Sequence, residues 1–214
     1  GVSQPDCNGG IGTVSWTTSG GIAPYDNILI NSNNDTLVNT QNPNTSYTFL
    51  PGVYHLLVTD ATGICFDIWN FVINDPSPLT TSYNSTNVSC FGGNDGSVTL
   101  YIYGGTTDYI VSAFGITIPL LGGLDSIASS TLPLPNGVPA GIYPFVVMDA
   151  NGCSTTGTVI ISQPTAITVS STTTNVSCNG ASDGTATVNV SGGTPGYSYS
   201  WNSNPIQTTA TAIN

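Results

Sequence analysis

The sequence contains no lysine, no arginine and no glutamate, and its 11 acidic residues are all aspartate, so the formal net charge is −11. Nucleic-acid binding relies on basic side chains that displace the counterions of the phosphates, and an anionic membrane surface attracts the same basic groups. The composition therefore excludes both as electrostatic partners. It also leaves the chain without any cleavage site for trypsin.

Long apolar runs are missing as well. No stretch approaches the roughly 20 apolar residues that a membrane-spanning helix needs, so we expect no membrane insertion. Helix is disfavoured in general, because Glu, Lys and Arg are absent while Thr, Ser, Val, Asn and Gly are abundant. No signal peptide is visible at the start, and we expect targeting information to lie outside these residues.

Residue types used in catalysis are scarce. His55 is the sole histidine and lies in a stretch of alternating apolar residues, and the second copy of that stretch has Pro144 in its place. A single histidine on a strand is far more often a surface residue than a general base. We therefore predict that the chain is not an enzyme and that it needs no cofactor.

What the sequence does contain is an internal repeat. Cys7, Cys90 and Cys178 open three copies with spacings of 83 and 88 residues, and a Gly-Gly pair follows each of these first cysteines. Two copies continue through a Gly-x-Tyr step to an aspartate turn that ends in a second cysteine, at Asp60–Cys65 and Asp149–Cys153. A period of about 85 residues suits a small domain with its own core. We predict three domains, residues 1–77, 78–164 and a partial third, 165–214.

Apolar and polar residues alternate through most of the apolar segments, which indicates β-strands. The predicted strands are Thr13–Trp16, Tyr25–Ile30, Tyr54–Thr59, Ile68–Ile73, Ser97–Ile102, Tyr109–Ala113, Tyr143–Met148, Thr156–Ser162, Thr185–Val190 and Tyr197–Trp201. Asn-Gly and Asp-Gly pairs mark the turns. The predicted fold class is all-β, with tandem immunoglobulin-like β-sandwich repeats that each hold one disulfide.

The five cysteines follow the repeat. We predict the disulfides Cys7–Cys65 and Cys90–Cys153 within the first two copies, and we expect the partner of Cys178 beyond Asn214. Buried free thiols are the alternative, whereas the C-x-x-C pairs of a zinc site are absent. Such disulfides imply an oxidising, extracytoplasmic setting.

Four aspartates, Asp60, Asp95, Asp149 and Asp183, lie in turns that contain glycine. Extracellular β-repeats often bind Ca²⁺ through loop carboxylates, which makes these residues weak calcium candidates. Aspartate in such turns also caps its own backbone, and no D-x-D-x-D cluster exists, so we favour capping. The aromatic residues near the Gly-Gly pairs, such as Trp16, are interpreted as core rather than as a platform for stacking sugars.

In combination, these landmarks resemble the SprB-type repeat of gliding bacteria. The third copy carries Cys178, Asp183-Gly184, Gly192–Tyr197 and Trp201. The second copy ends with Pro139–Tyr143, Val147–Cys153 and Gln163-Pro164. The first copy departs most, because Asn8–Gly12 lacks Asp-Gly and an extra residue precedes Cys65. The resemblance covers nearly the whole chain.

The resemblance implies a large adhesin at the cell surface, associated with the outer membrane, exported by type IX secretion and in some relatives moved by a gliding motor. The repeats would form its stalk, and gliding itself does not follow. Partners would be neighbouring repeats, other copies in a filament, surface glycans, or the motility and secretion machinery. Two alternatives stay open: a module that binds carbohydrate or a surface polymer, and a subunit of an extracellular filament.

Glycosylation has two candidate sites. Asp35-Thr36-Leu37 and Asp125-Ser126-Ile127 fit the Asp-Ser/Thr-apolar acceptor for O-glycans in the bacteria that carry this repeat family. They lie 17 and 16 residues before Gly52 and Gly141, which suggests equivalent places in two copies. We therefore predict Thr36 and Ser126 as O-glycosylation sites.

Overall fold

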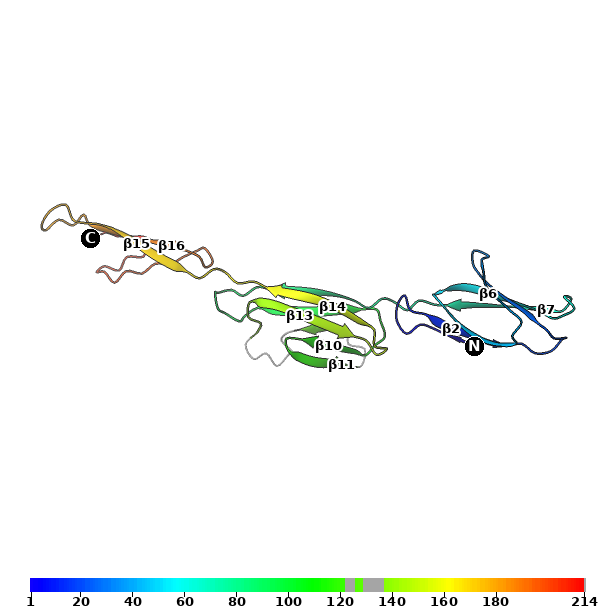
Figure 1. Ribbon diagram of the computed structural model, residues 1–214. Coiled ribbons are helices and arrows are strands. Elements are labelled where there is room, and N and C mark those ends of the chain that lie inside the picture. The colour runs from blue at the N-terminus through cyan, green and yellow to red at the C-terminus, as the bar shows by residue number, and fades with distance from the viewer. Residues whose placement is uncertain (122–125, 129–136, 214) are drawn as a thin grey trace. The chain divides into compact units, whose positions relative to one another are not determined.

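The computed structural model describes residues 1–121, 126–128 and 137–213, and none of these residues lies in a helix (Figure 1). The prediction of an all-β chain is therefore confirmed. Most of the predicted strands are present within a few residues of their expected limits. The immunoglobulin-like topology, the period of about 85 residues and the three domain boundaries remain predictions.

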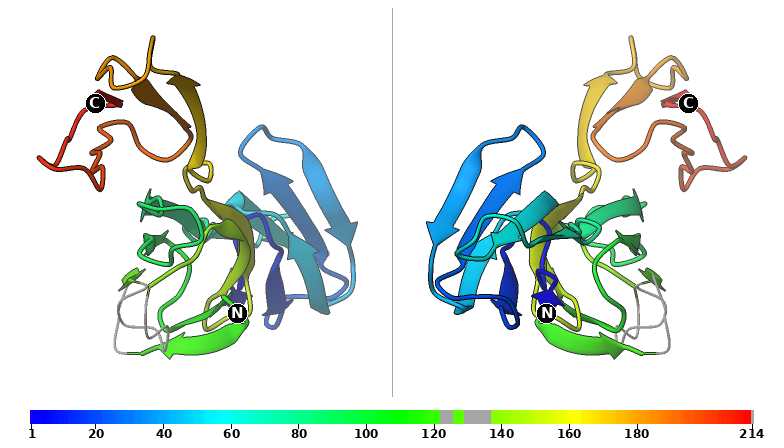
Figure 2. Two further views of the ribbon diagram at one scale, coloured as in Figure 1. Left: turned by 90° about the vertical axis from the view of Figure 1, so that its left-hand side faces the viewer. Right: turned by 90° about the vertical axis from the view of Figure 1, so that its right-hand side faces the viewer.

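The first copy forms two antiparallel sheets, drawn in blue to cyan in Figures 1 and 2. One sheet has the order β1-β2-β5 and the other has the order β4-β3-β6-β7. The strands are β1 (Val2–Ser3), β2 (Gly12–Thr17), β3 (Asp26–Asn31), β4 (Thr36–Thr40), β5 (Asn44–Phe49), β6 (Gly52–Thr59) and β7 (Phe66–Ile73).

The two sheets of the first copy contribute to one apolar core. The alternation of apolar residues places every second side chain of a strand on the same face, and these side chains are the buried ones. The members of the core are Val14, Trp16, Leu29, Tyr54, Leu56, Phe71 and Ile73. Trp16 belongs to this set, so its interpretation as a core residue is confirmed.

The core also holds a fully buried amide, Asn27. Its side-chain oxygen accepts hydrogen bonds from Trp16 Nε1 at 3.2 Å and from the Thr18 hydroxyl at 2.8 Å. Its side-chain nitrogen donates to the carbonyl oxygen of Thr40 at 3.1 Å. Because a buried polar group is costly without partners, this set of bonds makes the burial of Asn27 tolerable.

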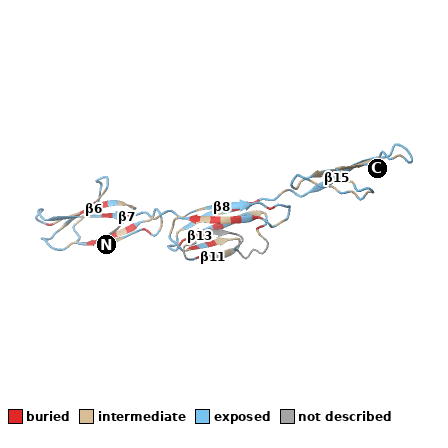
Figure 3. Cartoon of the chain, turned by 180° about the vertical axis from the view of Figure 1, so that it is seen from behind, coloured by how far each residue is buried: buried red, intermediate tan, exposed pale blue. Residues whose placement is uncertain are grey.

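The second copy repeats the pattern with the sheets β12-β9-β8 and β11-β10-β13-β14. Buried or partly buried residues alternate with exposed ones along β13, as Figure 3 shows. The strands are β8 (Thr80–Thr86), β9 (Ser97–Tyr103), β10 (Tyr109–Ala113), β11 (Ile116–Leu120), β12 (Ser126–Ala128), β13 (Gly141–Met148) and β14 (Ser154–Ile161).

The third copy forms one sheet, β15 (Thr168–Thr174), β16 (Thr185–Ser191) and β17 (Thr211–Ile213), in the order β15-β16-β17. Among the described residues after Ile161, no side chain is buried. The strand predicted over Tyr197–Trp201 does not form. Its counterparts in the first two copies, β3 and β10, pair with β6 and β13. The described residues of the third copy contain no counterpart of β6 or β13.

By compactness, the described residues fall into two units. One comprises the described parts of Gly1–Ser82, Tyr101–Asp125 and Phe145–Gly157, and it includes the core of the first copy. The other comprises the described parts of Tyr83–Leu100, Ser126–Pro144 and Thr158–Asn214, and it includes the sheet of the third copy.

Candidate functional site

The first cysteine of each copy opens a tight turn of the same form. The carbonyl oxygens of Cys7, Cys90 and Cys178 each accept a hydrogen bond, 3.0 Å long, from the amide three residues later. In the first copy this turn is held to the end of β7, because Gly9 N donates to Asp75 Oδ1 at 2.7 Å. In the second copy Gly92 N donates to Gln163 Oε1, also at 2.7 Å. In these two copies the first cysteine therefore lies beside the segment that leaves its own copy.

The second cysteine of the first two copies closes a turn that begins with aspartate. The amide of Asp60 donates to the carbonyl of Cys65 at 3.0 Å, and that of Asp149 donates to the carbonyl of Cys153 at 2.9 Å. Each aspartate also accepts a 3.0 Å bond at Oδ1 from the amide two residues later. The prediction of turn capping is thus confirmed at Asp60 and Asp149.

The aspartate turn is tied to the Gly-Gly pair of the same copy. Asp149 Oδ2 accepts a hydrogen bond from the amide of Thr106 at 2.9 Å, and Asp60 Oδ2 accepts one from the amide of Ile22 at 3.3 Å. The hydroxyl of Thr62 is the main cause that holds the pKa of Asp60 below its ordinary value; the amides of Ile22 and Thr62 add to this, while burial opposes it. Hydrogen bonds to the charged carboxylate favour that form.

The second and third Gly-Gly pairs hold the linkers that join the copies. Gly105 N donates to the carbonyl of Ser77 at 3.0 Å, and Gly193 N donates to the carbonyl of Thr165 at 2.7 Å. The glycine before each has a positive φ, and a Cβ added at Gly104 would lie 2.1 Å from the carbonyl oxygen of Pro78. No side chain fits there, so the linker requires glycine at this point. The pairs are visible in the sequence, whereas this contact is not.

The predicted disulfides are wrong. The structure joins Cys7 to Cys153, with 5.6 Å between their Cα atoms, and leaves Cys65, Cys90 and Cys178 as exposed free thiols. The reason is strand length. Cys65 precedes the eight residues of β7, whereas Cys7 lies beside the far end of that strand, about 26 Å away at ~3.3 Å per residue. A disulfide needs Cα atoms within about 7 Å.

The same reasoning excludes the pair Cys90–Cys153. Cys153 precedes the eight residues of β14, and the turn of Cys90 is bonded to Gln163 beyond the other end of that strand. The length of β14 therefore separates the two cysteines of the second copy, as the length of β7 separates those of the first. The first and second copies each have their first cysteine at one end of their last strand and their second cysteine at the other.

Short polar contacts surround the observed disulfide. The side-chain amide of Asn151 donates to the carbonyl oxygen of Asp6 and to the hydroxyl oxygen of Thr106, both at 3.1 Å. Asp6 thereby contacts the turn that carries Cys153. The sequence gives no sign of a role for Asp6 or Asn151, because it does not show that their two turns lie side by side.

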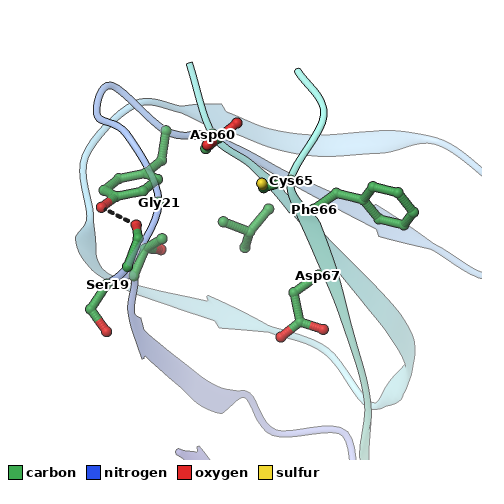
Figure 4. A pocket seen from close by; sticks show the side chains of 10 residues that line it. Ser19, Gly21, Asp60, Cys65, Phe66 and Asp67 are labelled. Atoms are coloured by element: carbon green, nitrogen blue, oxygen red, sulfur yellow. Dashed lines mark hydrogen bonds between the residues drawn. The ribbon is translucent and has the colours of Figure 1, made fainter. Parts of the chain in front are cut away.

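Cys65 lies in a hollow of the first copy of about 190 Å³. Figure 4 shows the Cys65 sulfur near Asp60, Phe66 and Asp67, with Gly21 on the neighbouring loop. The corresponding residues of the second copy are Gly105, Asp149 and Cys153, and there Ser77 and Cys7 occupy the place. A Cβ added at Gly20, the counterpart of Gly104, would meet no atom within 4 Å. The hollow therefore corresponds to the site that holds Cys7 in the second copy.

The other two aspartates cap the first-cysteine turns. Asp95 Oδ1 accepts the amide of Ser89 at 3.0 Å, and Asp183 Oδ1 accepts the amide of Ser177 at 2.9 Å. Hydrogen bonds from these serines, chiefly from their side chains, hold the pKa values of Asp95 and Asp183 below the ordinary range. Within the described residues no three His, Cys, Asp or Glu side chains gather as a metal site would require. Calcium binding at the four aspartates stays a weak prediction.

The two glycosylation candidates are not in equivalent places. Thr36 is exposed and begins β4, at the edge of the four-stranded sheet of the first copy. Ser126 begins β12, at the edge of the three-stranded sheet of the second copy, and its side chain lies outside the described residues. The counterpart of β4 in the second copy is β11, because both pair with the strand that follows the Gly-Gly turn. The similar spacing before Gly52 and Gly141 thus does not reflect a shared position.

His55 has a structural partner. Its Nδ1 lies 2.6 Å from Oδ1 of Asn70, the residue opposite it in the β6–β7 register. The tyrosine of the Gly-x-Tyr step is likewise structural. Tyr54 donates its hydroxyl to the carbonyl of Leu50 at 2.6 Å, and Tyr143 donates to Pro139 at 2.8 Å.

A family described as the SprB repeat matches residues 82–109 and 170–205. The chain contains SprB repeats. The two matches begin in β8 and β15 and run through the first-cysteine turn and the Gly-Gly pair, so they coincide with the recurring geometry of the second and third copies. An SprB repeat indicates the repeat region of a surface adhesin.

A search of curated proteins found no match to this chain. In the part of the chain that the structure describes, no helix is long and apolar enough to cross a membrane.

Proposed function

We propose that this chain is a stalk segment of a secreted bacterial cell-surface adhesin or fibre. The observation that carries the proposal is the covalent bond between the first two repeats, Cys7–Cys153. The linkers add to it, since each is hydrogen-bonded to the glycine turn of the next repeat, at Gly105 and at Gly193. Repeats that are bonded and docked to their neighbours can transmit a pulling force along an array.

The aromatic side chains support a stalk over a carbohydrate-binding module. A module that stacks sugars needs aromatic faces exposed in a row. In the first repeat several rings instead contact one another: Trp16 and Tyr47 have centroids 5.7 Å apart, and Tyr54 and Phe71 have centroids 5.5 Å apart. Trp16, Tyr54 and Phe71 are buried.

The proposal includes no catalysis and no cofactor. His55 is bonded to an amide, and each of the four aspartates singled out in the sequence accepts amide hydrogen bonds from a turn. We place the chain outside the cell, where a disulfide persists and where the lack of lysine and arginine protects against trypsin-like proteases. Thr36, exposed on an edge strand, is the better of the two O-glycan candidates.

Electron microscopy of intact cells, labelled with an antibody to this segment, tests the proposal. We expect label along thin filaments that project from the cell. Label confined to the cell body, or to soluble particles, would contradict a stalk and favour a binding module. The control is the same antibody after it has been absorbed with the purified chain.

A further inference from the structure

We propose that disulfides connect successive SprB repeats in a ladder, in which the first cysteine of each repeat is bonded to the second cysteine of the next. The Cys7–Cys153 bond is one rung. Cys90 is the first cysteine of another rung, and Cys65 is the second cysteine of a third. The pairing does not depend on the stalk proposal, because repeats held by short linkers alone could still form a stalk.

The complete junction defines what a rung requires. Its first part is the Cys7 turn, bonded through Gly9 to Asp75. Its second part is the linker, with the carbonyl of Ser77 bonded to Gly105. Its third part is the aspartate turn of the next repeat, which places Cys153 within reach of Cys7.

The next junction has the first two parts in the same form. The Cys90 turn is bonded through Gly92 to Gln163, at the same 2.7 Å as in the first junction. The linker carbonyl of Thr165 is bonded to Gly193, and Ile167 lies against that glycine as Leu79 lies against Gly105. Only an aspartate turn with its cysteine is needed to complete the site beside Cys90.

The hollow at Cys65 corresponds to the third part of a junction, the aspartate turn with its cysteine. The aspartate turn and the Gly20-Gly21 pair have the hydrogen bonds by which Asp149 contacts the loop of Gly104-Gly105. Among the residues that the structure describes, no linker or first-cysteine turn lies on them. Gly20 and Gly21 keep positive φ values of 85° and 63°, close to the 69° and 64° of Gly104 and Gly105. The occupant we propose is the linker and first-cysteine turn of another SprB repeat, because such a segment fills the matching site of the second repeat.

The chemistry of each rung is a thiol–disulfide exchange. Two cysteine thiols lose two protons and two electrons to form the S–S bond, and an external disulfide, carried by an oxidant protein or by glutathione disulfide, accepts them and leaves as two thiols. Cys65 and Cys90 are exposed, so an oxidant of this class can reach both.

Counting thiols in the purified, oxidised chain separates the pairings. The ladder predicts three thiols, at Cys65, Cys90 and Cys178, and a peptide linking Cys7 to Cys153 after digestion with an Asp-specific protease and chymotrypsin. Pairing within repeats would leave only Cys178 free. One thiol, or five, would overturn the proposal.

Matched variants guard against misfolding. Cys65→Ala is expected to leave the linked peptide at full yield, whereas Cys7→Ala is expected to abolish it and to expose Cys153 to alkylation. If Cys65→Ala released Cys7, the ladder would be wrong.

The ladder as a rule is tested on the native polypeptide taken from its cells. Mapping by mass spectrometry is expected to show Cys90 bonded to the second cysteine of the third repeat, and Cys65 bonded to a first cysteine of another repeat. Alkylatable Cys65 and Cys90 in that material would overturn the rule, even if filaments were labelled in the microscope.

Discussion

The amide of Gly105 donates a 3.0 Å hydrogen bond to the carbonyl oxygen of Ser77, so the segment that leaves the first repeat is held by the glycine turn of the second. Asp149 lies against the same turn, through its bond to Thr106, and the turn that it caps presents Cys153. The linker, the glycine pair and the aspartate turn thus act together to bring Cys7 and Cys153 into bonding distance. The glycine landmark of the sequence is therefore part of a connection between repeats.

Pulling on the ends of the oxidised chain should reveal the rung directly. The Cys7–Cys153 bond keeps 146 residues from extending, so adding a reductant under load should release about 500 Å of contour length in one step. Pairing within repeats would give two steps of roughly 200 Å each, at about 3.5 Å per residue. Single-molecule force spectroscopy makes the measurement, with Cys7→Ala as the chain that shows no reductant-dependent step.

Alanine at Gly104 should destabilise the chain more than alanine at Gly20. Both glycines have positive φ, and that conformation costs alanine about 1–2 kcal/mol. At Gly104 the Cβ would also lie 2.1 Å from the Pro78 carbonyl oxygen, whereas at Gly20 it would meet nothing within 4 Å. We expect Gly104→Ala to lower the free energy of unfolding by about 3 kcal/mol or to displace the linker. Urea titration of both variants checks this, and equal losses would refute a role for the linker contact.

Acid should destabilise the chain below about pH 4. Hydrogen bonds lower the pKa values of Asp60, Asp95 and Asp183 in the folded state. A depressed folded pKa contributes stability above the unfolded value, about 3.9, and this contribution is lost as the pH falls through the folded pKa. Carbon-detected NMR titration of Asp60 provides the site-specific measurement. Thr62→Val removes the main cause of the shift and should raise the pKa of Asp60 towards its ordinary value, while that of Asp95 stays where it was.

Phenylalanine at Tyr54 should cost about 1 kcal/mol of unfolding free energy. The change keeps the buried ring but deletes the hydroxyl that donates to the carbonyl of Leu50 at 2.6 Å. The exposed Tyr83 offers a matched control, and Tyr83→Phe should change the free energy by less than about 0.5 kcal/mol. Denaturant titrations of both variants measure the difference. An unchanged stability in Tyr54→Phe would mean that the hydrogen bond contributes nothing.

The all-β class and most of the strands could be predicted from the sequence, because both depend on local signals. Alternation fixed β2, β9 and β16, and the lack of helix-forming residues excluded the alternative. The sequence also indicated that the aspartates cap turns, since an Asp side chain reaches the backbone a few residues away. The resemblance to the SprB repeat rested on the same landmarks and was confirmed.

The pairing of the cysteines depends on how the strands and turns pack, which the sequence pattern does not show. The two cysteines recur at the same positions of the repeat, which suggested that they pair within one copy. Their positions in the sequence, however, do not give the distance between them in the folded repeat. β7 and β14 are eight residues long, and each separates the first cysteine of its repeat from the second. The linker that follows reaches the glycine turn of the next repeat. The length of β7 separates Cys7 from Cys65, which is nearer in the sequence. Cys7 is bonded instead to Cys153, 146 residues away.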